Sequence, residues 1–212
     1  MIDAHGSAQA ERETGRVEAF SDGVFAIAIT LLVLDLKVPR GPEPLATQLL
    51  SQWPSYVAFL TSFGTIGIMW LNHHRLFSLM HRIDHLLLVL NGLLLLGVTI
   101  TPFPTALVAD HIGHPGARLA AGVYSGIFVV IAIFFNALWR YASSPRRAPS
   151  ILKVRHDSDE VRAIHAQYRM GPVFYLLAFV LSFWSATASV AVCAGLALFF
   201  AIPPRTQTAG IS

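Results

Sequence analysis

The segment RVEAFSDGVFAIAITLLVLDL, residues 16–36, decides the fold. Together with the residues that follow, it forms an apolar run over about residues 20–38. That run is long enough for a transmembrane helix, which needs about 20 predominantly apolar residues. Ionisable side chains lie at both of its ends: Glu18, Asp22, Asp35 and Lys37. Because charges in or near a membrane span are costly and usually functional, this segment is the first candidate for a functional element.

The composition of the whole chain is that of a membrane protein. Hydrophobic residues make up 54% of the 212 residues and charged residues only 13%, against roughly 25% in soluble domains. So few charges could not cover the surface of a soluble enzyme. The apolar runs predict an all-α integral membrane protein with six transmembrane helices, at about residues 20–38, 56–76, 83–108, 118–139, 171–184 and 188–202. The single cysteine, Cys193, excludes an intrachain disulfide.

The basic residues are distributed unevenly between the two sides of this arrangement. With six spans, twelve of the fifteen Lys and Arg residues lie on the side that carries both termini. Because cytoplasmic loops carry an excess of Lys and Arg, we expect a multi-pass protein of the cell membrane with both termini cytoplasmic. Five spans would move only Arg205, so charge alone leaves that alternative open. The expected parts are a cytoplasmic N-terminal segment 1–15, a membrane domain 16–204 with a cytoplasmic connector 141–169, and a cytoplasmic tail 205–212.

Helical spacing sorts the side chains of the first span into two faces. At about 100° per residue, Ile27, Leu31 and Leu34 form one aliphatic stripe, with Thr30 beside it. Asp22 lies roughly 120–140° around the helix from that stripe. From composition alone, lipid contact or helix packing explains such a stripe, and the lining of a pore is the alternative.

A second polar group lies at the end of the second span, in the segment WLNHHRLF at residues 70–77. Trp70, His73 and His74 share a helix face at the same expected depth as Asp22. An imidazole, an indole N–H and the guanidinium of Arg16 would together satisfy a buried carboxylate. Asn91 in the third span could join this network. Capping of the helix start by Asp22 is the alternative.

These residues resemble a known signature. The pattern R-x-x-x-F-S-D at the start of a first span, here Arg16, Phe20, Ser21 and Asp22, is similar to that of the transmembrane protein 175 family. Its members are lysosomal potassium channels and their prokaryotic relatives. The segment at residues 70–77 resembles the family too. Because animal members carry two such six-helix units and this chain has one, it looks like the prokaryotic form.

The resemblance implies a potassium-permeable cation channel that assembles as a homotetramer, with the first helix lining a central pore. It implies a constriction at Ile27, Leu31 and Leu34, with Ile27 narrowest, and ion discrimination by Thr30. Arg16, Ser21 and Asp22 would fix the pore helix to its neighbours. The family lacks the T-V-G-Y-G filter of other potassium channels, and that motif is absent here. No cofactor or metal is implied, and protons or other monovalent cations are further candidate permeants.

Other functions fit the sequence less well than a channel. A proton- or metal-coupled transporter would need ionisable ligands at mid-membrane depth, and the span centres hold only Asn, Thr and Ser. His81 and His85 are four residues apart, a spacing compatible with metal binding. They lie in a polar connector, however, so an exposed helix start explains them better than a metal site. Asp35 is expected at the outer mouth, where it would concentrate cations or serve as an ordinary solvated carboxylate. The pI near 9.4 does not indicate nucleic acid, because the basic residues separate apolar runs. No nucleophile–base pair lies within the spans, so an enzyme is not expected.

Overall fold

The computed structural model describes residues 2–145 and 150–202, with side chains from Gln9 onward. Within these ranges the fold is all-α, as expected, and its only β-type pairing is an isolated bridge between Met80 and Leu152. The elements are α1 (Ile2–Leu31), the 3₁₀ helix η1 (Leu32–Asp35), α2 (Leu45–Ser51), α3 (Trp53–Ser78), α4 (His85–Ile100), α5 (Pro102–His111), α6 (Ala117–Ala142), α7 (Asp159–Arg169), α8 (Gly171–Ser182) and α9 (Ala186–Ala201).

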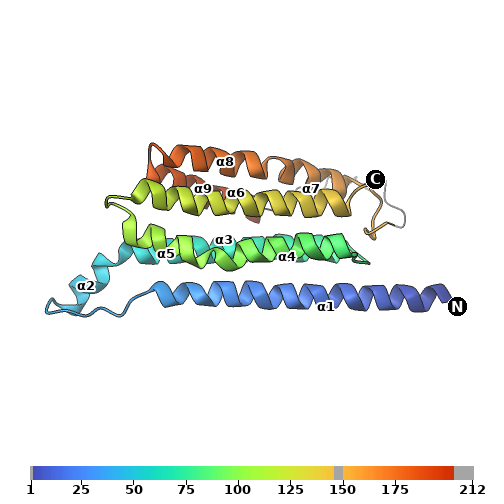
Figure 1. The fold of residues 1–212 in the computed structure, drawn as a ribbon, viewed down its shortest axis with the longest axis horizontal. Helices are drawn as coiled ribbons and strands as arrows, with labels where there is room; N and C mark the ends of the chain where they lie inside the picture. The colour runs from blue at the N-terminus through green and yellow to red at the C-terminus, as the bar shows by residue number, and fades with distance from the viewer. Residues whose placement is uncertain (1, 146–149, 203–212) are drawn as a thin grey trace, which may run out of the picture.

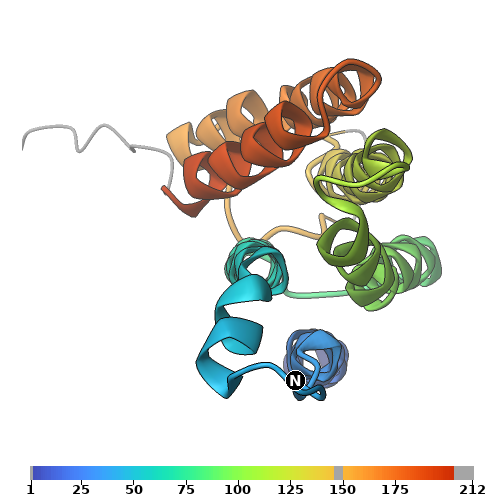
Figure 2. The same ribbon diagram turned by 90° about the vertical axis from the view of Figure 1, so that its left-hand side faces the viewer.

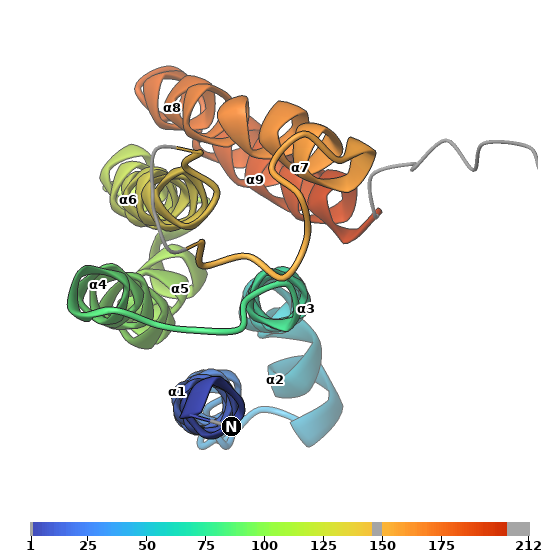
Figure 3. The same cartoon turned by 90° about the vertical axis from the view of Figure 1, so that its right-hand side faces the viewer.

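The long helices run side by side along one axis (Figure 1). The start of α1, the end of α6 and α7 lie at one end of the bundle, and α2 lies at the other. Viewed along the axis, α1 forms one edge and α8 and α9 form the opposite edge, with α3, α4 and α6 between them (Figures 2 and 3). Helix α1 is therefore covered by its own chain on one side only.

Four stretches of the described chain are long and apolar enough to cross a membrane: Gln9–Asp35, Trp53–Ser78, His85–His111 and Ala117–Ala142. They coincide with the first four spans expected from the sequence. Helices α8 and α9 are also apolar but have only 12 and 16 residues. The expected division of the last uncharged stretch is confirmed, because α8 ends at Ser182 and the Ser185 side chain caps the start of α9 by accepting from Ala188 N at 3.2 Å.

The first span differs from its expected limits at both ends. Helix α1 begins at Ile2, so most of segment 1–15 continues into the span as one helix. At the other end the α-helix stops at Leu31 and tightens into η1, and Leu36 is already extended. A proline at position 39 disfavours helical backbone just before it, which explains why the helix does not reach Val38.

Two prolines interrupt the third span, where the sequence predicts a kink. Helix α4 ends at Ile100, Thr101 is the joint, and α5 begins at Pro102. A proline removes a backbone donor and pushes its ring against the preceding turn, so the helix breaks there. The Thr105 hydroxyl donates to Thr101 O at 2.8 Å and lies 2.8 Å from the Ser62 hydroxyl of α3. The joint is therefore tied to a neighbouring helix.

Helix α4 packs unusually close to α6 at Gly97. A Cβ atom built on this glycine would lie 2.7 Å from Cγ1 of Ile131, a side chain that is itself buried. Real Cβ atoms do not approach a neighbour so closely, so only glycine fits at this crossing. Small residues at helix crossings let backbones approach in the same way in membrane proteins generally.

Candidate functional site

The aliphatic stripe of α1 faces away from the rest of the chain. Ile27 is 60% exposed, Leu31 38% and Leu34 72%, whereas Phe25 and Leu32 on the other side of the helix are buried. Thr30 is also exposed. The residues that the sequence groups into one stripe therefore share the open face of the helix in the single chain.

The 3₁₀ geometry at the end of α1 keeps the stripe straight. In a 3₁₀ helix, residues three apart lie above one another, so Leu34 stays close to the line of Leu31. Val38, which continues the stripe on α-helical spacing, lies beyond the helix. The stripe consists of three aliphatic positions and ends near Asp35.

The hydroxyl of Thr30 is oriented by its own helix. Its Oγ1 donates to Ile27 O at 2.9 Å. Because the hydroxyl proton is used by the backbone, the oxygen lone pairs are what the side chain offers to its surroundings. That is the polarity that suits a cation.

Asp35 is less exposed than expected for a carboxylate at an open mouth. It is half-buried, and its Oδ2 atom is buried without a hydrogen bond in the described part of the chain. Nearby, Lys37 forms an ion pair with Asp110 at 3.0 Å, which links the segment after η1 to α5. The burial of Oδ2 argues against the alternative of an ordinary solvated carboxylate, and the place of Asp35 at an outer mouth stays a prediction.

One of the signature residues, Ser21, belongs to a buried chain of hydrogen bonds across α1, α3 and α4. Asn91 Nδ2 donates to Ser21 Oγ at 3.0 Å, and the Ser21 hydroxyl donates to Val17 O at 2.8 Å. The other end of the Asn91 amide, Oδ1, lies 2.9 Å from His73 Nε2. Ser21, His73 and Asn91 are all buried. Asn91 is thus the link that joins the first and second spans to the third.

Asp22 belongs to a separate and more exposed set of contacts. The Trp70 indole N–H donates to Asp22 Oδ1 at 2.8 Å. One turn away on both helices, His74 Nδ1 lies 2.8 Å from Glu18 Oε1. The spacing of four residues on each helix repeats because α1 and α3 run antiparallel and in contact (Figure 1). No partner for Glu18 was predicted from the sequence. The spacing of four residues that Glu18 and Asp22 share with Trp70 and His74 could have indicated it.

Part of the expected network is not formed. Neither His73 nor His74 hydrogen-bonds to Asp22, because the first contacts Asn91 and the second contacts Glu18. Arg16 is exposed and has no hydrogen bond or ion pair with the described residues. Phe20 is also exposed. The prediction that an imidazole and a guanidinium hold Asp22 is therefore wrong for the single chain, whereas the indole contact is confirmed.

The segment between His81 and His85 has a structural role. Asp84 caps the start of α4 by accepting from Leu87 N at 2.9 Å, and it accepts from the Tyr141 hydroxyl at 2.8 Å. Among the side chains of residues 9–145 and 150–202, no group of three His, Cys, Asp or Glu residues is arranged to hold a metal ion.

Known proteins resemble the chain over the same region and beyond it. The sequence profile of the family described as endosomal/lysosomal potassium channel TMEM175 matches residues 16–102. A protein of Chamaesiphon minutus named a potassium channel is 57% identical over 196 residues, which cover 91% of this chain and 95% of the relative. A protein of Streptomyces collinus, also named a potassium channel, is 44% identical over 203 residues, covering 93% and 97%. The Gallus gallus endosomal/lysosomal proton channel TMEM175 is 32% identical over 178 residues, which cover 79% of this chain and 36% of that protein.

Solved structures agree with the sequence relatives. The crystal structure of a lysosomal potassium-selective channel TMEM175 homolog from Chamaesiphon minutus matches with a TM-score of 0.82 at 55% identity, covering 92% of this chain and all of that chain. The potassium channel MtTMEM175, crystallised as a variant in complex with a nanobody fusion protein, matches with a TM-score of 0.58 at 19% identity over 89% of this chain and 88% of that chain, a likeness of fold. The chain therefore belongs to the TMEM175 family of potassium channels, a family of ion channels and not of enzymes.

Proposed function

We propose that this protein is a potassium-permeable cation channel of the cell membrane, formed by four copies of the chain around a central pore lined by α1. Each copy contributes six transmembrane helices within residues 16–204, with the segment 1–15, the connector 141–169 and the tail 205–212 on the cytoplasmic side. The family membership and the names of the two bacterial relatives support the choice of ion.

One observation carries the proposal: the open face of α1 holds the aliphatic stripe and Thr30, while Phe25 and Leu32 on the opposite face pack against their own chain. A single chain offers one such helix, at the edge of the bundle (Figure 3). A pore lined on all sides requires several copies. Lipid contact is the competing explanation, and it gives Thr30 no role.

In the assembled channel, Ile27 forms the narrowest ring, and Leu31 and Leu34 form the next rings toward the outside. Rings of aliphatic side chains offer an ion no oxygen, and such constrictions gate by losing water. Thr30 presents four hydroxyl oxygens beside these rings, and they replace part of the hydration shell of a potassium ion. Asp35 at the outer end attracts cations toward the entrance.

The polar contacts of α1 hold the pore helix in place rather than contact the ion. Ser21, bound to Asn91, and Asp22, bound to Trp70, lie on the side of α1 that faces α3 and α4. Selectivity arises here without the T-V-G-Y-G segment. Protons are a second permeant to test, because the animal relatives are named proton channels.

The test is ion flux into vesicles of neutral lipid that contain the purified protein. Wild-type protein should pass potassium faster than sodium. Ile27→Ala should raise the flux of both ions, because a wider ring holds water more readily. The matched control is Ile133→Ala, which removes the same atoms from an exposed isoleucine on α6. Equal flux in wild type and Ile27→Ala, or an equal increase in the control, would contradict a constriction at Ile27.

A further inference from the structure

A basic pocket lies where the end of α6 meets α7. Its volume is about 440 Å³, within the range of about 300–1,000 Å³ typical of small-ligand sites. No Asp or Glu of the described chain lines it. The side chains that give it its character are Asn136, Trp139, Arg140, Arg162, His165 and Arg169.

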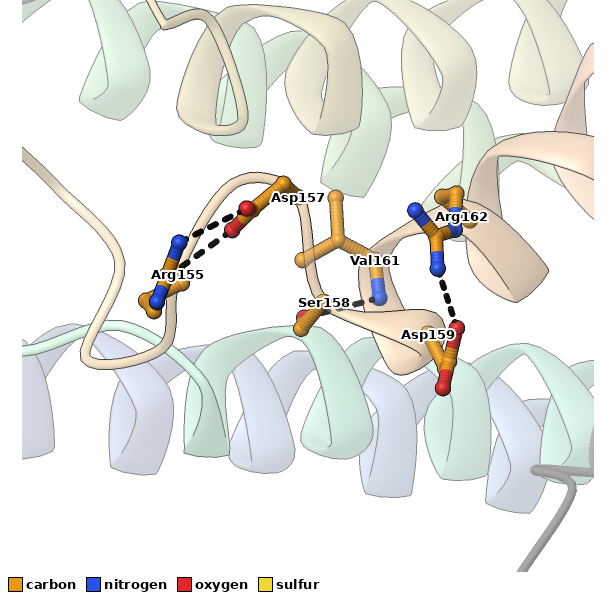
Figure 4. Close-up of polar contacts among 6 residues, drawn as sticks. All are labelled: Arg155, Asp157, Ser158, Asp159, Val161 and Arg162. Carbon is orange, nitrogen blue, oxygen red and sulfur yellow. Dashed lines mark hydrogen bonds and ion pairs between the residues drawn. The ribbon is translucent and has the colours of Figure 1, made fainter. Parts of the chain in front are cut away.

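The positive charge of the basic pocket is only partly balanced. Arg162 pairs with Asp159, one turn earlier on α7 (Figure 4). Both side chains are 67% exposed, and exposed pairs of this kind contribute little. Arg140 and Arg169 form no ion pair with described residues. Partial desolvation, and then the charge of Arg140, lower the pKa of His165.

Trp139 adds an unsatisfied donor to the lining. The residue is 1% exposed, and its indole N–H has no acceptor in the described part of the chain. A buried donor without an acceptor is uncommon and costly. An oxygen-rich anion brought into the pocket would be favoured by the charges of its three arginines.

An apolar groove adjoins the basic pocket. The groove lies between α3, α6, α8 and α9, has a volume of about 60 Å³, and shares Tyr168 with the basic pocket. Its lining is almost entirely apolar and includes Phe128, Ile131, Phe135 and Phe200. Helices α7 to α9 lie on the side of the bundle opposite α1 (Figure 3). In the proposed tetramer this side faces the lipid, and the basic pocket lies at the cytoplasmic end.

We propose that the basic pocket binds the phosphate of an anionic phospholipid from the cytoplasmic leaflet, with the first methylene groups of an acyl chain against the adjoining groove. Arg140 and Arg169 hold the phosphate oxygens, and Arg162 contributes when it leaves Asp159. Anionic headgroups are recognised by basic pockets between helices on the cytoplasmic side of membrane proteins. Free phosphate would satisfy the charges but leave the groove unexplained. The assignment rests on the membrane orientation proposed above, and does not depend on which residues form the pore.

The experiment compares lipid binding by the full-length protein in mild detergent, using native mass spectrometry with phosphatidylglycerol or phosphatidylcholine added. Wild type should retain phosphatidylglycerol in preference to phosphatidylcholine. Arg140→Gln and Arg169→Gln should each lower that preference about fivefold, the effect of the ~1 kcal/mol that one basic residue contributes near an anionic surface. The matched control is Arg155→Gln, whose arginine is exposed, pairs with Asp157 outside the pocket, and carries the same charge (Figure 4).

The outcomes separate the alternatives. An equal loss in Arg155→Gln would overturn the proposal, because it would indicate general attraction to a basic surface. Displacement of phosphatidylglycerol by an equal concentration of soluble glycerol phosphate would overturn the lipid as occupant. Retention by Arg140→Lys and Arg169→Lys, which keep the charge, would support the site and exclude misfolding as the cause. Since lipid retention is measured without ion flux, a failure of the channel proposal would be seen separately.

Discussion

The side-chain amide of Asn136 donates a hydrogen bond to the backbone carbonyl of Tyr168 at 2.7 Å. The carbonyl lies four residues before Pro172, which has no N–H to donate to it. In a membrane every backbone polar group needs a partner within the protein, and a helix interrupted by proline is tolerated when a neighbour supplies one. Asn136 on α6 thus permits α8 to follow α7 almost without interruption.

Replacing Asn136 should destabilise the protein. We expect Asn136→Leu to lower the free energy of unfolding by about 1 kcal/mol, the typical net contribution of one hydrogen bond, because the Tyr168 carbonyl is part-buried and would keep only the backbone N–H of Met170 nearby. Thermal unfolding in detergent measures this. In a Pro172→Ala background, the restored backbone N–H of residue 172 can donate to the Tyr168 carbonyl. Asn136→Leu should therefore lower the free energy of unfolding by less in that background. An equal cost in both backgrounds would mean that the amide acts in another way.

The contact between Trp70 and Asp22 should be measurable as a coupling energy. In a double-mutant cycle with Trp70→Phe and Asp22→Ala, we expect a coupling of about 1.5 kcal/mol, at the low end for a bond to a charged group because Trp70 is partly exposed. The control cycle pairs Asp22→Ala with Trp184→Phe, just beyond the end of α8, and should be additive. Additivity in the first cycle would rule out a stabilising role for the contact.

A close helix crossing predicts opposite effects for two glycines of α4. Gly97→Ala should destabilise the protein by about 1–3 kcal/mol, because the new methyl group would collide with buried Ile131. Gly92→Ala meets nothing within 4 Å and should be neutral or slightly stabilising, since alanine favours a helix. Thermal unfolding of the two variants tests this prediction. Equal changes in stability for Gly92→Ala and Gly97→Ala would contradict a close helix approach at Gly97.

A tetramer with α1 at its axis predicts cross-linking at Leu31. In lipid vesicles, treatment of Leu31→Cys with a four-armed maleimide reagent should give cross-linked species that end at four chains, because the four thiols converge and each can occupy one arm of the reagent. The native Cys193 is buried and should not react. Ile133→Cys, on α6 away from α1, should give no such ladder. A ladder that ended at two chains, or one of equal yield from Ile133→Cys, would disprove a fourfold axis along α1.

Thr30 should set the preference among ions. Thr30→Val keeps the shape of the side chain and removes its oxygen, so the ratio of potassium to sodium flux should fall while the fold survives. Thr99→Val is the matched control, because its hydroxyl likewise donates to a carbonyl of its own helix, Leu95 O at 2.8 Å. Potassium and sodium flux measured side by side for wild type and both variants gives this ratio. An unchanged ratio in Thr30→Val would show that these hydroxyls do not contact the ion.

The sequence by itself determined the parts of the protein that depend on local composition and spacing. The run at residues 20–38 is apolar over a full membrane thickness, and two prolines after Thr101 break any helix, so spans and kinks follow from the chain alone. The grouping of Ile27, Leu31 and Leu34 on one face of α1 followed too, because helical periodicity fixes which side chains share a face, whereas only the structure shows that this face is open.

Only the tertiary structure decided which polar groups meet. Trp70, His73 and His74 looked equivalent as partners for Asp22, yet His73 contacts Asn91 and His74 contacts Glu18. The rotation and depth of α3 against α1 and α4 make that choice, and they result from packing along the whole helices. The tertiary structure also decides that position 97 must be glycine, because the side chain that leaves no room for a Cβ atom there is Ile131, 34 positions away in the sequence. Spacing along one helix cannot encode the distance to another, because that distance is set by how all the side chains between them fit together.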